Sequence, residues 1–264
     1  MGLKFEDRIV VFIDILNFRS LVEESAKSPD GDTSERLERA LTVIEKMASA
    51  MSSPPEDTNT TDPASLASAN PHLQIFSDSI ILSINPDTDS LNHLLRELTA
   101  LFLTLMTLGI WIRGGLAHGK MSVKKATPCG PAMNVAYYTE SMIAKNPRIA
   151  FAKDLVDWCR EQQNGVLESS FVNRDKDGVY VLEPLKAVSD RALSHNVDPR
   201  ENASDIRQHL EYALLNVVDR PDVYAKISDL ADRWNEWTDP RKGYFENDER
   251  LFGYRTLEEV YLDA

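Results

Sequence analysis

The sequence is short of cysteine: it has only Cys129 and Cys159, and no CxxC pair. This argues against a disulfide scaffold, which needs more bridges, and against a zinc ribbon, which needs closely paired cysteines. So few cysteines agree with a reducing cytosol. We therefore expect a cytoplasmic protein.

Positive charge is also scarce, since 29 Lys and Arg residues face 42 Asp and Glu residues, a formal net charge of −13. This balance argues against non-specific binding to nucleic acid or to an anionic membrane. It is compatible with a small anionic ligand, because a cation or a cluster of backbone N–H groups can reverse the field at one site.

Long apolar runs are missing as well. The most apolar stretch, "LTALFLTLMTLGIWI" at residues 98 to 112, falls short of the roughly 20 residues that a membrane span needs. The opening "MGLKFEDRIV" runs directly into a predicted strand and has no signal-peptide pattern. We expect a soluble protein with no membrane partner.

The 264 residues, 42% of them hydrophobic, suffice for one large domain, or for one domain with a helical appendage. The Val- and Ile-rich "RIVVFIDI" at residues 8 to 15 predicts a central strand. Apolar residues at helical spacing predict helices at 18 to 27 and 33 to 52. Residues 53 to 71 are rich in Pro, Ser, Thr and Asn, and predict a mobile surface loop.

The later segments alternate between strand and helix patterns until about residue 185. Further strands are predicted at 73 to 84 (two short ones), 110 to 123, 148 to 152 and 177 to 184, and helices at 89 to 108, 129 to 145 and 154 to 163. This order predicts an α/β (α+β) sandwich. We expect a catalytic domain at residues 1–185 and a helical extension at 186–264.

Two aspartates stand out in this arrangement. Asp14 interrupts the apolar run "VVFIDILNF", and a buried carboxylate costs several kcal/mol unless it is paired, neutralised or bound to a metal. Asp78 lies at the predicted turn "SDS". Neighbouring strands would place both carboxylates at one end of the sheet, where Mg²⁺ or Mn²⁺ could lie between them. The simpler alternative is that Asp14 caps a helix and Asp78 serves only the turn.

Five motifs in order are more specific than the aspartates alone. "FIDILNF", "IFSDSIIL", "IRGGLAHGKM", "GPAMNVAYYTES" and "PRIAFAKDL" together resemble the motifs of class III nucleotidyl cyclases. The resemblance covers residues 8 to about 155, or to about 184 with the last strand. It implies a βααββαβ core with a mixed antiparallel sheet.

The resemblance also implies how a nucleoside triphosphate would be held. Asp14 and Asp78 would bind two divalent ions per site, Mn²⁺ or Mg²⁺, with the Ile15 carbonyl as a further ligand. The backbone amides of Asn17 and Phe18 would contact the β- and γ-phosphates. The ribose 3′-OH would then attack the α-phosphorus in line, and pyrophosphate would leave without a dedicated protein base.

By the same resemblance, Asn134 would stabilise the transition state. In the family each site takes its aspartates from one chain and its asparagine from the other. Because this chain carries both halves, the resemblance implies a homodimer with two composite sites.

The sequence departs from the purine cyclases where these read the base. Gln74, four residues before Asp78, and Thr127, seven before Asn134, match neither the adenine pair nor the guanine pair. Tyr138 stands where the family has an arginine that grips the α-phosphate. Kept metal aspartates with altered base readers most resemble the pyrimidine cyclases of the bacterial Pycsar antiphage system. These make cyclic UMP, the favoured product here, or cyclic CMP, which a separate effector senses.

Alternatives remain at several positions. Arg113 is a candidate for a phosphate or a dimer contact, and Arg148, Lys153 or Arg174 could replace the missing arginine. His118 has no Cys or second His nearby, so it does not indicate a zinc site. A degenerate cyclase-like module that binds nucleotides or scaffolds a partner, and a purine cyclase with an atypical base pocket, are the alternative functions.

Overall fold

The structure is a computed structural model that describes residues 3–52, 71–123, 128–189, 201–218, 220–239 and 250–251. Apart from residue 71, the loop expected at 53 to 71 lies outside the described residues, and so does Thr127. No helix in the described ranges combines the length and the apolarity needed to span a membrane.

The strands and helices follow the order expected from the sequence, with one short strand and one 3₁₀-helix in addition. They are β1 (Glu6–Ile15), α1 (Phe18–Lys27), α2 (Asp32–Ser52), β2 (His72–Phe76), β3 (Ser79–Ile84), α4 (Thr88–Thr107), β4 (Ile112–Met121), α5 (Pro131–Tyr138), the π-helix η1 (Thr139–Ala144), β5 (Ile149–Phe151), α6 (Lys153–Gln162), the 3₁₀-helix η2 (Val166–Glu168), β6 (Val172–Arg174), β7 (Tyr180–Leu182), α7 (Pro184–Ser189), α8 (Ala203–Asn216) and α9 (Pro221–Trp237).

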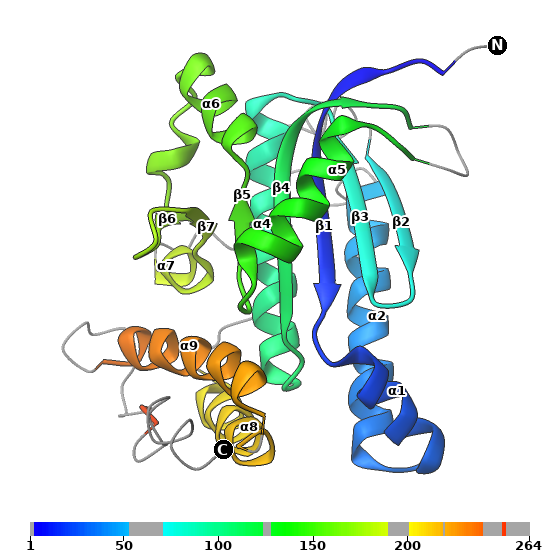
Figure 1. Cartoon of the computed structure of the whole chain (residues 1–264), viewed down its shortest axis with the longest axis vertical. Coiled ribbons are helices and arrows are strands. Elements are labelled where there is room, and N and C mark those ends of the chain that lie inside the picture. Colours follow the sequence, from blue (N-terminus) through cyan, green and yellow to red (C-terminus); the bar gives the residue numbers. More distant parts are fainter. Residues whose placement is uncertain are drawn as a thin grey trace.

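Within the described residues the strands form one seven-stranded sheet in the order β2-β3-β1-β4-β5-β7-β6. β4 and β5 run parallel, and the other neighbours are antiparallel. The long helices α2 and α4 lie behind the sheet, and α5 lies in front of it (Figure 1). The expected α/β class with its βααββαβ core and mixed sheet is confirmed.

Alternation along β1 assigns its side chains to the two faces of the sheet. Ile9, Val11 and Ile13 belong to the large hydrophobic cluster that includes the apolar side of α4. Val10 and Phe12 belong to a smaller cluster with alanines of α5. Asp14 is two residues beyond Phe12, so it lies on the face that α5 covers.

One strand was missed from the sequence. We expected a single last strand at residues 177 to 184, but the structure has a hairpin of β6 and β7 there. The sequence of β6 is "VNR", with one buried residue and two exposed ones. Three residues are too few to reveal a period of two, so only the pairing with β7 defines this strand.

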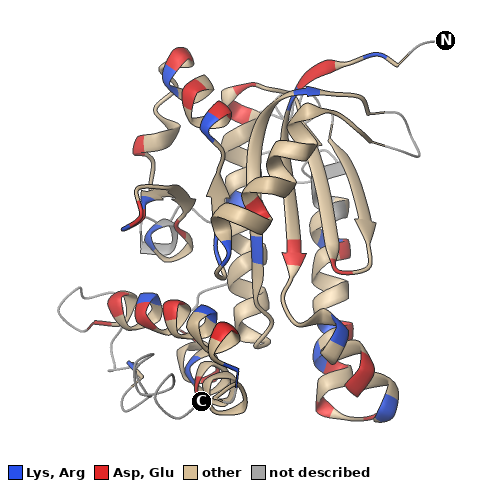
Figure 2. Ribbon diagram, in the orientation of Figure 1, with Lys and Arg blue, Asp and Glu red and all other residues tan. Residues whose placement is uncertain are grey.

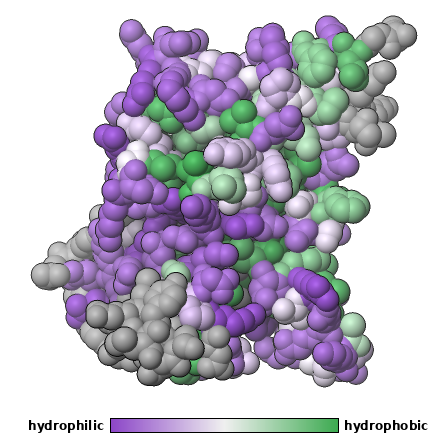
Figure 3. Space-filling model, in the orientation of Figure 1, coloured by the Kyte–Doolittle hydropathy of each residue, from purple (hydrophilic) through white to green (hydrophobic). Residues whose placement is uncertain are grey.

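The C-terminal helices share the core of the sheet. Buried side chains of α8 and α9, such as Ile206, Leu210 and Trp234, belong to the same hydrophobic cluster as Ile9 and Val11. α8 and α9 are therefore packed onto the sheet-bearing part of the chain. On the visible face of the molecule, apolar residues lie in separate patches among hydrophilic ones (Figure 3).

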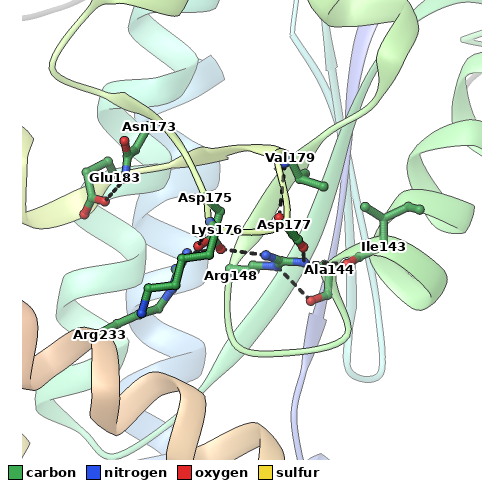
Figure 4. Close-up of polar contacts among 10 residues, drawn as sticks. All are labelled: Ile143, Ala144, Arg148, Asn173, Asp175, Lys176, Asp177, Val179, Glu183 and Arg233. Atoms are coloured by element: carbon green, nitrogen blue, oxygen red, sulfur yellow. Dashed lines mark hydrogen bonds and ion pairs between the residues drawn. The ribbon is translucent and has the colours of Figure 1, made fainter.

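An ionic network adds to this packing (Figure 4). The Arg148 guanidinium donates hydrogen bonds to the Asp175 and Asp177 carboxylates, both at 2.6 Å, and to backbone carbonyls of η1. Arg233 of α9 bonds to the same Asp175 carboxylate at 2.6 Å. The β6–β7 turn thereby fixes α9 relative to the end of η1.

Close packing of α5 and η1 on β4 depends on Gly115. A Cβ at this position would lie 2.3 Å from the Ala136 carbonyl oxygen and 2.7 Å from the Glu140 amide nitrogen. Both contacts are with backbone, which cannot move aside as a flexible side chain would. The second glycine of "RGG" is therefore required by the approach of the helix.

We predict that Gly115→Ala destabilises the protein by about 1–3 kcal/mol, the usual cost of overpacking a core. Urea unfolding followed by circular dichroism measures this change as the difference in the free energy of unfolding. A variant with wild-type stability would contradict the close approach of α5 to β4.

Candidate active site

Asp14 and Asp78 lie at the same end of two neighbouring strands. Asp14 is the penultimate residue of β1 and is the Cα partner of Ser79 in β3. The Ile15 amide donates a hydrogen bond to the Asp78 carbonyl oxygen at 2.9 Å. Ser77 has a φ of 55°, which turns the chain sharply before Asp78. The pairing of β1 with β3 thus brings together the two predicted metal-binding aspartates.

Arg113 lies beside Asp14 on β4, the neighbour of β1 on the side opposite to β3. The two residues are Cα partners in the β1–β4 pairing, and the guanidinium Nη2 and Nε lie 3.1 and 3.2 Å from Asp14 Oδ2. Figure 2 shows an acidic and a basic position side by side where β1 ends and β4 begins. Arg113 therefore stabilises a carboxylate at the end of an apolar strand.

Burial raises the pKa of Asp14 above its ordinary value. The Arg113 guanidinium opposes this rise, and the negative charge of Asp78 adds to it. A carboxylate whose neighbour carries the same charge favours its ionised form when a cation lies between the two. A cation beside Asp14 would therefore oppose the effect of its burial.

The donor atoms fit a hard divalent cation. Asp14 and Asp78 offer carboxylate oxygens, and Ile15, which stands between Asp14 and the turn into α1, offers a backbone carbonyl. Mg²⁺ and Mn²⁺ prefer such oxygen ligands. Within the described ranges no group of three or more His, Cys, Asp or Glu side chains could hold a metal. Any ion here would therefore keep positions open for water or phosphate oxygens.

The turn between β1 and α1 contradicts the simpler interpretation of Asp14. The N-cap residue of α1 is Asn17, which has a left-handed backbone (φ 61°, ψ 21°), and Phe18 begins the helix. Asp14 is three residues earlier and still within β1, so it does not cap α1. The Asn17 side chain makes no capping hydrogen bond, so the first amides of α1 are available to an anion.

Glu140 joins this cluster, and the sequence analysis missed it. Its side chain is 2% exposed and forms an ion pair with Arg113 Nε. Burial raises its pKa to about 7, Arg113 lowers it, and the charge of Asp14 contributes to the rise. An acidic residue in a helix usually faces solvent, so "YYTESMIAK" carries no signal for burial; only the packing of η1 against Gly115 places Glu140 inside.

Asn134 and Tyr138 lie away from this carboxylate cluster. In α5 the buried side chains are Ala132 and Ala136, one turn apart. Asn134 and Tyr138 are also one turn apart, both are exposed, and they project from the opposite side of the helix. A single chain therefore does not bring Asn134 to Asp14 and Asp78.

Gln74 lies on the same face of the sheet as Asp14. The strand pairings place Gln74, Ile81 and Phe12 in one row across β2, β3 and β1. Phe12 faces α5, as Asp14 does, and the row runs two residues from Asp14. The other predicted base reader, Thr127, is outside the described residues.

The three candidates for the missing arginine all have other partners. Arg148 is occupied by Asp175, Asp177 and carbonyls, Lys153 pairs with Asp157, and Arg174 donates to the Gly178 carbonyl oxygen at 3.1 Å. His118 stacks on Trp158, with ring centroids 5.3 Å apart, and burial lowers its pKa. In the described structure only Arg113, of all these candidates, touches the carboxylate cluster.

Comparison with known proteins gives weak similarities. No family model and no curated protein matches the chain. Among solved structures, the monomeric guanylyl cyclase domain of the RhoGC fusion protein from the aquatic fungus Blastocladiella emersonii is 14% identical, with a TM-score of 0.42, covering 69% of this chain and 98% of that one. An adenylate/guanylate cyclase/hydrolase from Silicibacter pomeroyi is 15% identical, with a TM-score of 0.43 and the same coverage. Similarities at this level do not establish a family or an activity.

We predict a pH-dependent contribution of Glu140 to stability. The folded carboxyl keeps its proton up to about pH 7, whereas the unfolded one has a pKa near 4.5, so the folded state is favoured at low pH. This contribution is lost as the pH rises between these two values. Urea unfolding from pH 4 to 8 should show the wild type losing stability relative to Glu140→Gln across that window. A constant difference between the two proteins would contradict the raised pKa.

Proposed function

We propose that this protein is a nucleotidyl cyclase. The observation that carries the proposal is the placement of the Asp14 and Asp78 carboxylates at adjoining strand ends, directly before an uncapped helix. Two acidic side chains next to free helix amides suit a metal-bound triphosphate. The ordered motifs that resemble class III cyclases point to the same chemistry.

The carboxylates, the Ile15 carbonyl and the helix amides have separate roles in this proposal. Asp14, Asp78 and the Ile15 carbonyl would hold Mn²⁺ or Mg²⁺, two ions per site. These ions would promote ionisation of the ribose 3′-OH and neutralise phosphate charge. The amides of Asn17 and Phe18 orient the terminal phosphates. Arg113, already beside Asp14, offers a guanidinium to a phosphate oxygen while Glu140 holds its Nε side.

Two chains complete each site in this proposal. Asn134 and Tyr138 project from α5 away from their own sheet, so they are free to reach the carboxylates of a partner. Large apolar side chains are exposed on α5 and η1, where Tyr137, Tyr138 and Met142 are each more than half exposed, and at the hairpin tip, where Phe76 is 76% exposed. A homodimer would bury these groups and pair Asn134 of each chain with Asp14 of the other.

The substrate we propose is a pyrimidine nucleotide, UTP or CTP, converted to 3′,5′-cyclic UMP or cyclic CMP and pyrophosphate. Gln74 shares the α5 face with Asp14, and Thr127 and Tyr138 replace further residues of the purine cyclases. An amide at Gln74 can both donate to and accept from a pyrimidine edge. The product would be an antiphage second messenger read by a separate effector.

The proposed division assigns catalysis to residues 1–185 and support to the helical extension 186–264. This is a division of roles rather than of cores, because α8 and α9 share the large hydrophobic cluster with the sheet.

The first test is turnover of each of the four nucleoside triphosphates with Mn²⁺, with products identified by mass spectrometry. We expect cyclic UMP, or cyclic CMP, from the matching triphosphate. Asp14→Asn and Asp78→Asn should lower the rate at least about 100-fold, because the metal ions that neutralise the phosphates would lose a carboxylate ligand. Asp157→Asn on α6 is the matched control and should retain wild-type activity.

Each other outcome of this assay contradicts a defined part of the proposal. Cyclic AMP or cyclic GMP as the main product would contradict the proposed pyrimidine substrate but would support the proposed cyclase activity. Nucleotide binding without pyrophosphate release from any substrate would instead support the non-catalytic binding module, which the tyrosine at position 138 favours.

The composite site predicts complementation between two inactive variants. Asp14→Asn and Asn134→Ala are each inactive as homodimers, but a mixed dimer contains one intact site. Random mixing makes half of the dimers mixed, so refolding the two variants together should restore about a quarter of the wild-type rate. No recovery, with mixed dimers verified by tagged copies, would contradict a site shared between chains.

A further inference from the structure

A cleft of about 770 Å³ separates the first helices from the C-terminal ones. α1 and α2 form one wall and α8 and α9 the other, beyond the ends of β1 and β4 (Figure 1). Leu16 and Asn17 of the β1–α1 turn also line the cleft. The cleft therefore begins at the turn whose amides follow Asp14.

Lys226 of α9 is the unusual charge in this cleft. Its side chain is half-buried, and among the residues that the structure describes it has no hydrogen-bond or ion-pair partner. Arg36, another cation of the cleft, already donates to the Leu108 and Gly109 carbonyl oxygens. A half-buried ammonium that makes no ion pair among the described residues would gain a direct partner if an anion joined it.

The position of Lys226 is fixed by its helix. Tyr224, Ile227 and Trp234 are buried on the adjoining turns of α9, and Arg233 bonds to Asp175 in the network of Figure 4. The ammonium is close enough to Asp14 to lower the pKa of that carboxyl. Lys226 thus faces the carboxylate end of the sheet from a helix that is anchored at several points.

We propose that the Lys226 ammonium pairs with the terminal phosphates of the nucleotide whose phosphates lie at the β1–α1 turn. This inference rests on the proposed function and deepens it: the C-terminal extension supplies a positive charge to the phosphate end of the site. A triphosphate at the Asn17 amides would extend into the cleft and provide the anion that Lys226 lacks. The C-terminal extension then contributes α9 to the binding site as well as to the hydrophobic core.

The test measures binding of inorganic tripolyphosphate with Mn²⁺ by isothermal titration calorimetry. This probe has the phosphates but neither base nor ribose. Lys226→Met should raise the Kd about tenfold or more, the usual weight of a charge-assisted contact. Lys226→Arg keeps the charge and should stay within about threefold of wild type. Lys153→Met is the matched control, because this exposed lysine pairs only with Asp157 of its own helix, and it should change nothing.

The same titrations with the α,β-methylene analogue of UTP, whose bridging carbon prevents loss of pyrophosphate, should give the same ratios. A loss confined to the nucleotide analogue would overturn the proposal, because Lys226 would then contact base or ribose. Equal Kd values for wild type and Lys226→Met, with unchanged circular dichroism, would overturn it as well.

Failure of this inference and failure of the proposed function are distinguishable. If Lys226→Met binds tripolyphosphate as wild type does while cyclic nucleotide still forms, only the role of Lys226 fails. If no triphosphate is cyclised but tripolyphosphate binding depends on Lys226, the contact between Lys226 and phosphate is supported and the proposed cyclase activity is wrong. A wild type that binds neither tripolyphosphate nor any nucleoside triphosphate overturns both.

Discussion

The repulsion between two carboxylates at one end of the sheet is the constraint on which the rest of this site depends. Asp14 is carried there by the alternation of β1, and Asp78 by the β2–β3 turn, whose carbonyl accepts the Ile15 amide. These backbone contacts hold the two residues next to each other, so the charge of Asp78 acts on Asp14. Arg113 stabilises Asp14 from one side. A divalent cation between the two carboxylates would offset the remaining negative charge.

The surroundings of the pair are built to hold Arg113 in place. Glu140 is buried against its guanidinium, and η1 can reach that depth only because Gly115 leaves room for the backbone of α5 and η1. The paired glycines of β4, the buried acid and the cross-strand arginine therefore form one arrangement. The C-terminal helices add a second layer, because the Arg148 and Asp175 network fixes α9, and Lys226 of α9 lines the same cleft as the β1–α1 turn.

Much of this could be predicted from the sequence, where a local pattern determines the structure. The strand that carries Asp14 near its end, the helix after it and the "SDS" hairpin were predicted because alternation, helical spacing and turn residues are properties of neighbouring positions. Glu140 and Lys226 were missed because their environments depend on packing between distant segments. β6 was missed because three residues carry no period. Asn134 projects from the exposed side of α5, away from the carboxylates of its own chain. Only in the proposed homodimer would it reach them, and a single sequence does not encode the position of a second chain.

The central claim is that Asp14 and Asp78 jointly bind the metal of a bound triphosphate. Anomalous diffraction at the manganese edge, from crystals grown with Mn²⁺ and the α,β-methylene analogue of UTP, tests it most directly. The account predicts manganese peaks in contact with both carboxylates and with phosphate oxygens, at the β1–α1 turn. Manganese bound elsewhere, with Arg113 still the only cation on Asp14, would contradict it.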